Sequence, residues 1–208
     1  MVRYIFLGFR LIVFGGLVCW NLSACLAASP SYSCSKVKEG SIEALVCADE
    51  SLAALDRQLA GVYAQAIARL GEDRSMELRI EQRGWIRSRD ACSKTAEPQL
   101  CALRQYSQRI AELQATYRLV PMTGPVLFFC EDPARTKLYV TYYATDPATI
   151  IVEHHNQFTL MYLEPGMSGA RYVRKSQSFW EHQGEALVSW GFDLPEIQCR
   201  TRSQKNAR

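Results

Sequence analysis

KLYVTYYATDPATIIVEHHNQFTLMY, residues 137–162, carries the repeating pattern that decides the fold of the C-terminal half of the chain. Apolar side chains recur at every second position in two runs, and a period of two is typical of β-strands. The alternating residues are Leu138, Val140 and Tyr142 in the first run and Phe158, Leu160 and Tyr162 in the second. Asp146-Pro147 lies between the runs, where a turn is expected.

Further short strands are expected at 149–153 within this stretch and, on both sides of it, at 126–130, 170–175, 178–182, 185–190 and 196–200. Turn residues separate them, among them Asp132-Pro133, Pro165-Gly166 and Gln183-Gly184. About eight short strands within roughly 75 residues are typical of a small antiparallel barrel or sandwich. We therefore predict an eight-stranded antiparallel β-barrel.

The preceding part of the chain, from Ser41 to Arg118, has helical periodicity instead. It predicts three helices, the first starting after an Asp49 N-cap and ending at Leu70-Gly71, the second at 75–91 and the third at 99–119. Arg87, Arg89 and Asp90 on the second helix predict an exposed face with surface ion pairs.

The fold class is therefore α+β in two domains, a disulfide-stapled helical bundle followed by the barrel. The expected boundaries are a signal peptide at 1–25, a linker at 26–33, the helical domain at 34–119, a linker at 120–125, the barrel at 126–200 and a basic tail at 201–208.

The N-terminus has the features of an export signal. Arg3 and Arg10 precede a short apolar run that is closed by small residues. Leu22-Ser23-Ala24-Cys25 is similar to a bacterial lipobox, in which Cys25 becomes the lipidated N-terminus. The alternative is cleavage after Ala27 or Ala28, which discards Cys25. Both readings predict an exported protein, and the first predicts a lipoprotein of the periplasm, anchored in the outer membrane.

Six cysteines follow the signal, an even number that predicts disulfides in an oxidising compartment. Cys130 and Cys199 lie on the first and last expected strands, and their bond would contribute about 4 kcal/mol in the chain-entropy model. Antiparallel helix packing favours Cys47–Cys92 with Cys34–Cys101. The alternative is Cys34–Cys92 with Cys47–Cys101.

Composition argues against several classes of function. The chain has 24 Lys and Arg and 21 Asp and Glu, and Arg3 and Arg10 belong to the signal, so the exported part is close to neutral. A nucleic-acid-binding protein would need a basic patch. No zinc-binding spacing and no Ser-His-Asp or paired-carboxylate pattern stands out. We expect no metal, cofactor, catalytic residue or small-molecule substrate, and a binding protein rather than an enzyme.

Several motifs of the C-terminal half occur in a specific order. They are Phe129-Cys130-Glu131-Asp132, Leu138-Tyr139-Val140-Thr141-Tyr142, Ser168-Gly169-Ala170-Arg171-Tyr172, Phe179-Trp180 and Gly184-Glu185-Ala186, with Cys199 closing the series. In this order they resemble the MliC/PliC family, the membrane-bound and periplasmic inhibitors of c-type lysozyme. The resemblance implies an eight-stranded antiparallel barrel.

The helical half resembles the LprI-type domain, an exported module with four cysteines. The matching positions are Cys47, Leu52, Leu55, Asp56, Leu59, Tyr63, Gln82, Trp85, Arg89, Asp90, Cys92, Cys101, Tyr106, Arg109 and Ile110. This resemblance implies a fold and a compartment but no mechanism.

The barrel resemblance also implies a binding site for c-type lysozyme. In that family the serine of the Ser-Gly-x-x-Tyr loop and a lysine on the following hairpin engage the two catalytic carboxyl groups. The loop residues here are Ser168, Gly169, Ala170, Arg171 and Tyr172. His182 stands at the lysine position, so inhibition should strengthen as the pH falls and the imidazole gains a proton. Arg171 or Lys175 could supply the cation instead.

A non-catalytic structural or assembly module of the envelope is the alternative function. A near-neutral protein with histidine in place of lysine is less suited to a basic enzyme, because complementary charge favours association. The barrel would then bind another partner.

Overall fold

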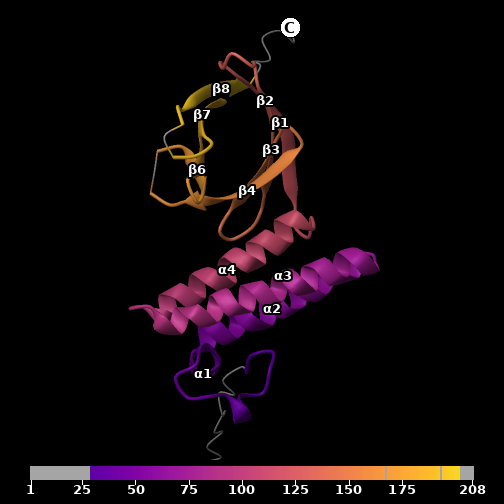
Figure 1. Cartoon of the computed structure of the whole chain (residues 1–208), viewed down its shortest axis with the longest axis vertical. Helices are drawn as coiled ribbons and strands as arrows, with labels where there is room; N and C mark the ends of the chain where they lie inside the picture. Colours follow the sequence, from indigo (N-terminus) through magenta and orange to yellow (C-terminus); the bar gives the residue numbers. More distant parts are fainter. Residues whose placement is uncertain (1–28, 167, 193, 202–208) are drawn as a thin grey trace, which may run out of the picture.

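A computed structural model describes residues 29–166, 168–192 and 194–201 of the chain. A helical layer and a β-barrel lie at opposite ends of the long axis, and α4 lies next to the barrel (Figure 1). The predicted fold class is therefore confirmed. The signal at 1–25, Cys25 and residues 202–208 of the predicted tail lie outside the described residues.

Four α-helices build the N-terminal half. They are α1 (Ile42–Ala48), α2 (Glu50–Ala68), α3 (Glu72–Asp90) and α4 (Pro98–Thr116), with short 3₁₀ turns at Cys34–Lys36 and Ala91–Lys94. The three predicted helices are confirmed as α2, α3 and α4, whereas α1 was not predicted as a separate helix. Asp49 alone separates α1 from α2, and its extended backbone ends the first helix while its side chain caps Leu52 N–H at 2.9 Å.

The helical core is apolar and closely packed. Tyr106, Leu52, Leu78 and Leu113 are among its largest fully buried side chains. Each such side chain contributes about 1.5–3 kcal/mol through burial. Burial of the apolar faces of the helices therefore holds the bundle together.

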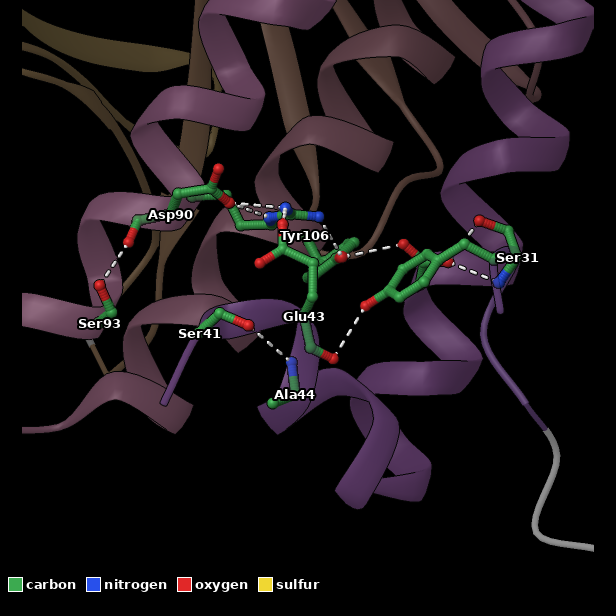
Figure 2. A network of polar contacts seen from close by, with 10 residues as sticks. Ser31, Ser41, Glu43, Ala44, Asp90, Ser93 and Tyr106 are labelled. Atoms are coloured by element: carbon green, nitrogen blue, oxygen red, sulfur yellow. Dashed lines mark hydrogen bonds and ion pairs between the residues drawn. The ribbon is translucent and has the colours of Figure 1, made fainter. Parts of the chain in front are cut away.

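A buried polar network crosses this core (Figure 2). Arg89 is only 5% exposed and donates to Tyr106 Oη at 3.0 Å, to Asp90 Oδ1 at 2.6 Å and to Glu43. Burial raises the pKa of Tyr106, so its hydroxyl stays protonated and donates to Asp56 Oδ1 at 2.9 Å. The prediction of an exposed ion-paired face was therefore wrong for Arg89, because Glu43 of α1, Asp90 of its own helix and the Tyr106 hydroxyl of α4 hold the guanidinium inside.

Both predicted pairings of the four N-terminal cysteines were wrong. The bonds are Cys34–Cys47 and Cys92–Cys101, with sequence separations of 13 and 9 residues. The 3₁₀ turn before α1 folds back onto that helix, and the turn between α3 and α4 brings Cys92 to Cys101. Each cysteine thus pairs with a partner close in sequence, and not across the bundle as the prediction required.

The C-terminal half is a closed barrel of eight antiparallel strands, each paired with its neighbours in sequence and β1 with β8. The strands are β1 (Met122–Cys130), β2 (Lys137–Tyr143), β3 (Thr149–His154), β4 (Gln157–Glu164), β5 (Ala170–Arg174), β6 (Gln177–His182), β7 (Glu185–Ser189) and β8 (Ile197–Thr201). Cys130 and Cys199 are direct register partners, and their predicted disulfide is confirmed. Phe128 and Phe179 meet edge to face at 5.3 Å inside the barrel.

The barrel packs against the helices through its outer wall. Tyr143 and Leu160 are buried there against Ala115 of α4. Tyr162 Oη donates to the carbonyl of Gln108 on α4 at 3.3 Å. These contacts hold the two halves together at α4 (Figure 1).

Candidate functional site

Two segments that are apart in sequence lie side by side at one end of the barrel. The first is the Ser168 loop, residues 165, 166, 168 and 169 between β4 and β5, and the second is the His182 hairpin, residues 180–186 across β6 and β7. Trp180 Nε1 donates a hydrogen bond of 2.8 Å to the carbonyl oxygen of Ser168. Strand pairing continues this contact, because Ala170 is the register partner of Glu181.

Gly169 allows the Ser168 loop to approach the hairpin closely. Its φ is +78°, a conformation that L side chains rarely adopt. A Cβ atom at this position would lie 2.6 Å from the carbonyl oxygen of Glu181 and 3.3 Å from Cβ of His182. Only glycine fits this backbone against the neighbouring strand.

His182 is presented at the tip of a tight two-residue turn. Gln183 and Gly184 have φ values of +53° and +83°, as the type I′ hairpin requires. His182 and Ser168 are both exposed to solvent. Beside them the outer wall of β6, β7 and β8 carries an open depression of about 370 Å³, lined by Trp180, His182, Glu185, Ala186, Leu187 and Gln198.

Tyrosine side chains inside the barrel contact β5 and β6, the strands next to the Ser168 loop. Tyr142 Oη donates to Glu181 Oε2 at 2.7 Å, and its ring meets that of Tyr172 edge to face at 6.2 Å. Burial raises the pKa of both tyrosines, so their hydroxyls remain neutral donors. Tyr172 is only 8% exposed and belongs to the barrel core, so its position suits support of the loop rather than direct contact with a partner.

The two alternative cations are less suited to this site than His182. Arg171 forms an ion pair with Glu164, the residue opposite it on β4. Lys175 follows the far end of β5, and the five residues of that strand span about 16 Å. The structure therefore brings the backbone of Ser168 and Gly169 next to Trp180, Glu181 and His182, whereas Ala170 packs against the barrel interior and Arg171 is paired with Glu164.

Two family models match the chain, one in each half. Residues 34–119 match the model described as lysozyme inhibitor LprI. Residues 128–196 match the model described as membrane-bound lysozyme-inhibitor of c-type lysozyme, and this span contains both the Ser168 loop and the His182 hairpin.

Relatives that align over most of their length identify the family of this chain. The lipoproteins LprI of Mycobacterium bovis and Mycobacterium tuberculosis are each 33% identical over 193 residues, covering 86% of this chain and 93% of theirs. The chain belongs to the LprI lipoprotein family. No solved structure matches this LprI-family chain significantly.

The residues that carried the LprI resemblance have a structural explanation. Asp56, Arg89, Asp90 and Tyr106 form the buried network of the helical half, and Trp85 packs edge to face against Tyr106 at 5.2 Å. They lie in the bundle interior and not in the Ser168 site.

Sequence reasoning missed two supporting residues of that site, the donor Trp180 and the acceptor Glu181. Trp180 appeared only as part of a motif, and nothing in the sequence indicates that its ring bonds a loop 12 residues away. Among the described residues no cluster of three or more His, Cys, Asp or Glu side chains could hold a metal. No helix of the described ranges is long and apolar enough to cross a membrane.

Proposed function

We propose that this protein binds c-type lysozyme and blocks its catalytic cleft without itself being an enzyme. The observation that carries this proposal is the contact between the Ser168 loop and the His182 hairpin, which form one exposed ridge in the half of the chain that matches the lysozyme-inhibitor model. The descriptions of both family models support lysozyme as the partner, and the model matched by the barrel names the c-type enzyme.

The chemistry of the cleft explains why these two side chains suit it. A c-type lysozyme uses one protonated Glu as general acid and one ionised Asp. The Ser168 hydroxyl can accept a hydrogen bond from the protonated carboxyl group. The imidazolium of His182 can donate to the ionised carboxylate, a charge-assisted bond that is stronger than a neutral one. Inhibition should therefore strengthen at lower pH, where more imidazole is protonated.

We further propose that the protein is an envelope lipoprotein. Its relatives are named lipoproteins, and Leu22-Ser23-Ala24-Cys25 supports lipidation of Cys25 after export. The three disulfides of the described chain agree with an oxidising compartment. The proposed location is the periplasm, with the lipid anchored in the outer membrane.

The test is lysis of a bacterial cell-wall suspension by a c-type lysozyme, titrated with oxidised protein at pH 6 and pH 7.5. Wild type should inhibit, saturating near one equivalent and more strongly at pH 6. Ser168→Ala should weaken inhibition at both pH values. His182→Lys should abolish the pH dependence and strengthen inhibition at pH 7.5.

His155→Lys is the matched control, because His155 is also exposed but lies in the β3–β4 turn. It should leave inhibition and its pH dependence unchanged. If folded wild-type protein did not inhibit at micromolar excess, the barrel would bind another partner and the envelope-module alternative would replace this proposal.

A further inference from the structure

Residues 29–33 are fixed onto the helical half by hydrogen bonds. Ser31 donates to Asp56 Oδ2 twice, from its backbone N–H at 2.7 Å and from its hydroxyl at 2.5 Å (Figure 2). Arg57 donates to the carbonyl oxygen of Ser29 at 2.7 Å. Pro30, between Ser29 and Ser31 in the sequence, is buried. We call residues 29–33 the N-terminal clamp.

The clamp is connected to the rigid interior rather than to a surface loop. Asp56, its main acceptor, is only 7% exposed and is also bonded to Tyr106, which is bonded in turn to Arg89. Tyr32 adds a bond to the carbonyl of Glu43 at 3.1 Å, and Cys34 is linked to Cys47 of α1 immediately afterwards. Residues 29–33 are therefore connected to α1, α2 and α4 through hydrogen bonds and a disulfide.

The tether between a lipid on Cys25 and the clamp is very short. Only Leu26, Ala27 and Ala28 lie between Cys25 and Ser29. Even fully extended, this stretch spans about 14 Å from Cα to Cα. The clamp and its surroundings must then lie at the lipid head groups.

The surface next to the clamp suits an anionic membrane. Lys36 and Lys38 are exposed there, against a single exposed acid, Glu39, within residues 29–41. Cationic side chains near a bilayer are attracted to anionic head groups. The barrel lies at the opposite end of the long axis, with α2, α3 and α4 between it and the clamp end (Figure 1).

We propose that the clamp end of the helical half, residues 29–41, is a membrane-docking surface for anionic lipid. The helices then act as a rigid spacer that keeps the Ser168 site away from the bilayer. This inference rests on the proposed lipidation of Cys25, and it does not depend on lysozyme being the partner.

Hydrogen–deuterium exchange of the lipidated full chain on vesicles of phosphatidylethanolamine and phosphatidylglycerol tests it. Amides of residues 29–41 should exchange about tenfold more slowly on vesicles than in detergent, whereas residues 164–170 and 182–185 should not change. A flexible Gly/Ser insertion between Ala28 and Ser29 should remove this protection and leave vesicle binding intact. The matched control is the same insertion after Arg208, which should keep the protection.

The clamp itself is tested in the absence of vesicles. Asp56→Asn and, as a milder variant, Arg57→Ala should both speed exchange within residues 29–33. Protection of the barrel loops by vesicles, or protection of 29–41 that survives the long tether, would overturn the proposal. So would equal protection of residues 29–41 on vesicles of neutral phosphatidylcholine. Loss of lysozyme inhibition alone would overturn only the proposed function, because the exchange pattern does not involve the enzyme.

Discussion

Trp180 Nε1 donates a 2.8 Å hydrogen bond to the backbone carbonyl oxygen of Ser168, and this bond joins the two segments of the proposed binding ridge. A loop that is already held in its binding conformation loses less conformational entropy when it meets a partner. The ring of Trp180 also lines the depression beside His182. Trp180 is therefore expected to act on affinity by positioning Ser168.

Trp180→Phe removes the donor but keeps an aromatic ring on β6. We expect the dissociation constant for lysozyme to rise about threefold to tenfold, the usual value of one hydrogen bond, with a small change in thermal stability. Calorimetric titration measures the first quantity and thermal unfolding the second. Trp190→Phe is the control, since Trp190 stacks on His154 outside the ridge. Equal effects of the two substitutions would contradict the positioning role.

Gly169 and Gly166 allow a test of the close approach between loop and hairpin. Both have positive φ, so alanine at either position costs about 1–2 kcal/mol in backbone strain. Only at Gly169 would the new Cβ meet a backbone atom, the Glu181 carbonyl at 2.6 Å, whereas nothing lies within 4 Å at Gly166.

Gly169→Ala should therefore displace Ser168 and reduce inhibition far more than Gly166→Ala does. The inhibition assay together with urea unfolding of both variants separates strain from displacement. If the two variants lost inhibition in proportion to their stability alone, the contact with Glu181 would have no role in binding.

Much of the fold could be predicted from local patterns in the amino-acid sequence. Alternation at Leu138, Val140 and Tyr142 predicted a strand because one face of a barrel strand is buried and the other is not. Asp49 predicted a helix start because its carboxylate satisfies an otherwise unpaired N–H of Leu52. These features depend on a few neighbouring residues.

The errors concern relations that depend on three-dimensional packing. The pairing of Cys34 with Cys47 depends on a 3₁₀ turn that no periodic pattern marks. Arg89 is buried because Glu43, Asp90 and Tyr106 converge on it from different elements, and sequence spacing does not reveal such convergence. The same limit applies to Trp180, whose hydrogen bond crosses from one hairpin to a loop.

Arg89 and Arg87 offer a matched pair for testing the buried network. Arg89→Met leaves the carboxylates of Glu43 and Asp90 without their cation. Because these carboxylates are 34% and 43% exposed, the loss of the guanidinium and its hydrogen bonds should cost about 1–3 kcal/mol. Arg87→Met lies on the exposed side of the same helix and should change stability by no more than about 0.5 kcal/mol. Urea unfolding followed by circular dichroism at the helical signal measures both. A loss below about 1 kcal/mol for Arg89→Met would show that the network contributes little.

The disulfides should differ in their effect on stability. Cys130–Cys199 joins residues 69 apart, so replacing both cysteines with alanine should cost about 4 kcal/mol. The corresponding change at Cys92 and Cys101, which are 9 apart, should cost about 3 kcal/mol and act on the helical half. Thermal unfolding compares the two variants, and peptide mapping without reduction checks the pairing. Recovery of a Cys47–Cys92 peptide would contradict the structure.

His154 should make the barrel less stable in mild acid. Its ring stacks on Trp190 at 4.9 Å, and burial, followed by the charge of His155, lowers the pKa of His154, while Asp132 opposes this shift. The unfolded chain binds a proton near pH 6.5, at about the ordinary value for histidine, and the folded chain binds it only at lower pH. The stabilising contribution is therefore present above about pH 6.5 and is lost as the pH falls through the folded-state pKa.

An NMR titration of the His154 ring and urea unfolding at pH 7.5 and pH 5 measure the shift and its effect. Trp190→Ala, which uncovers the ring, should raise the pKa of His154 and reduce the pH dependence. A wild-type His154 that titrates at or above the ordinary histidine value would contradict this account.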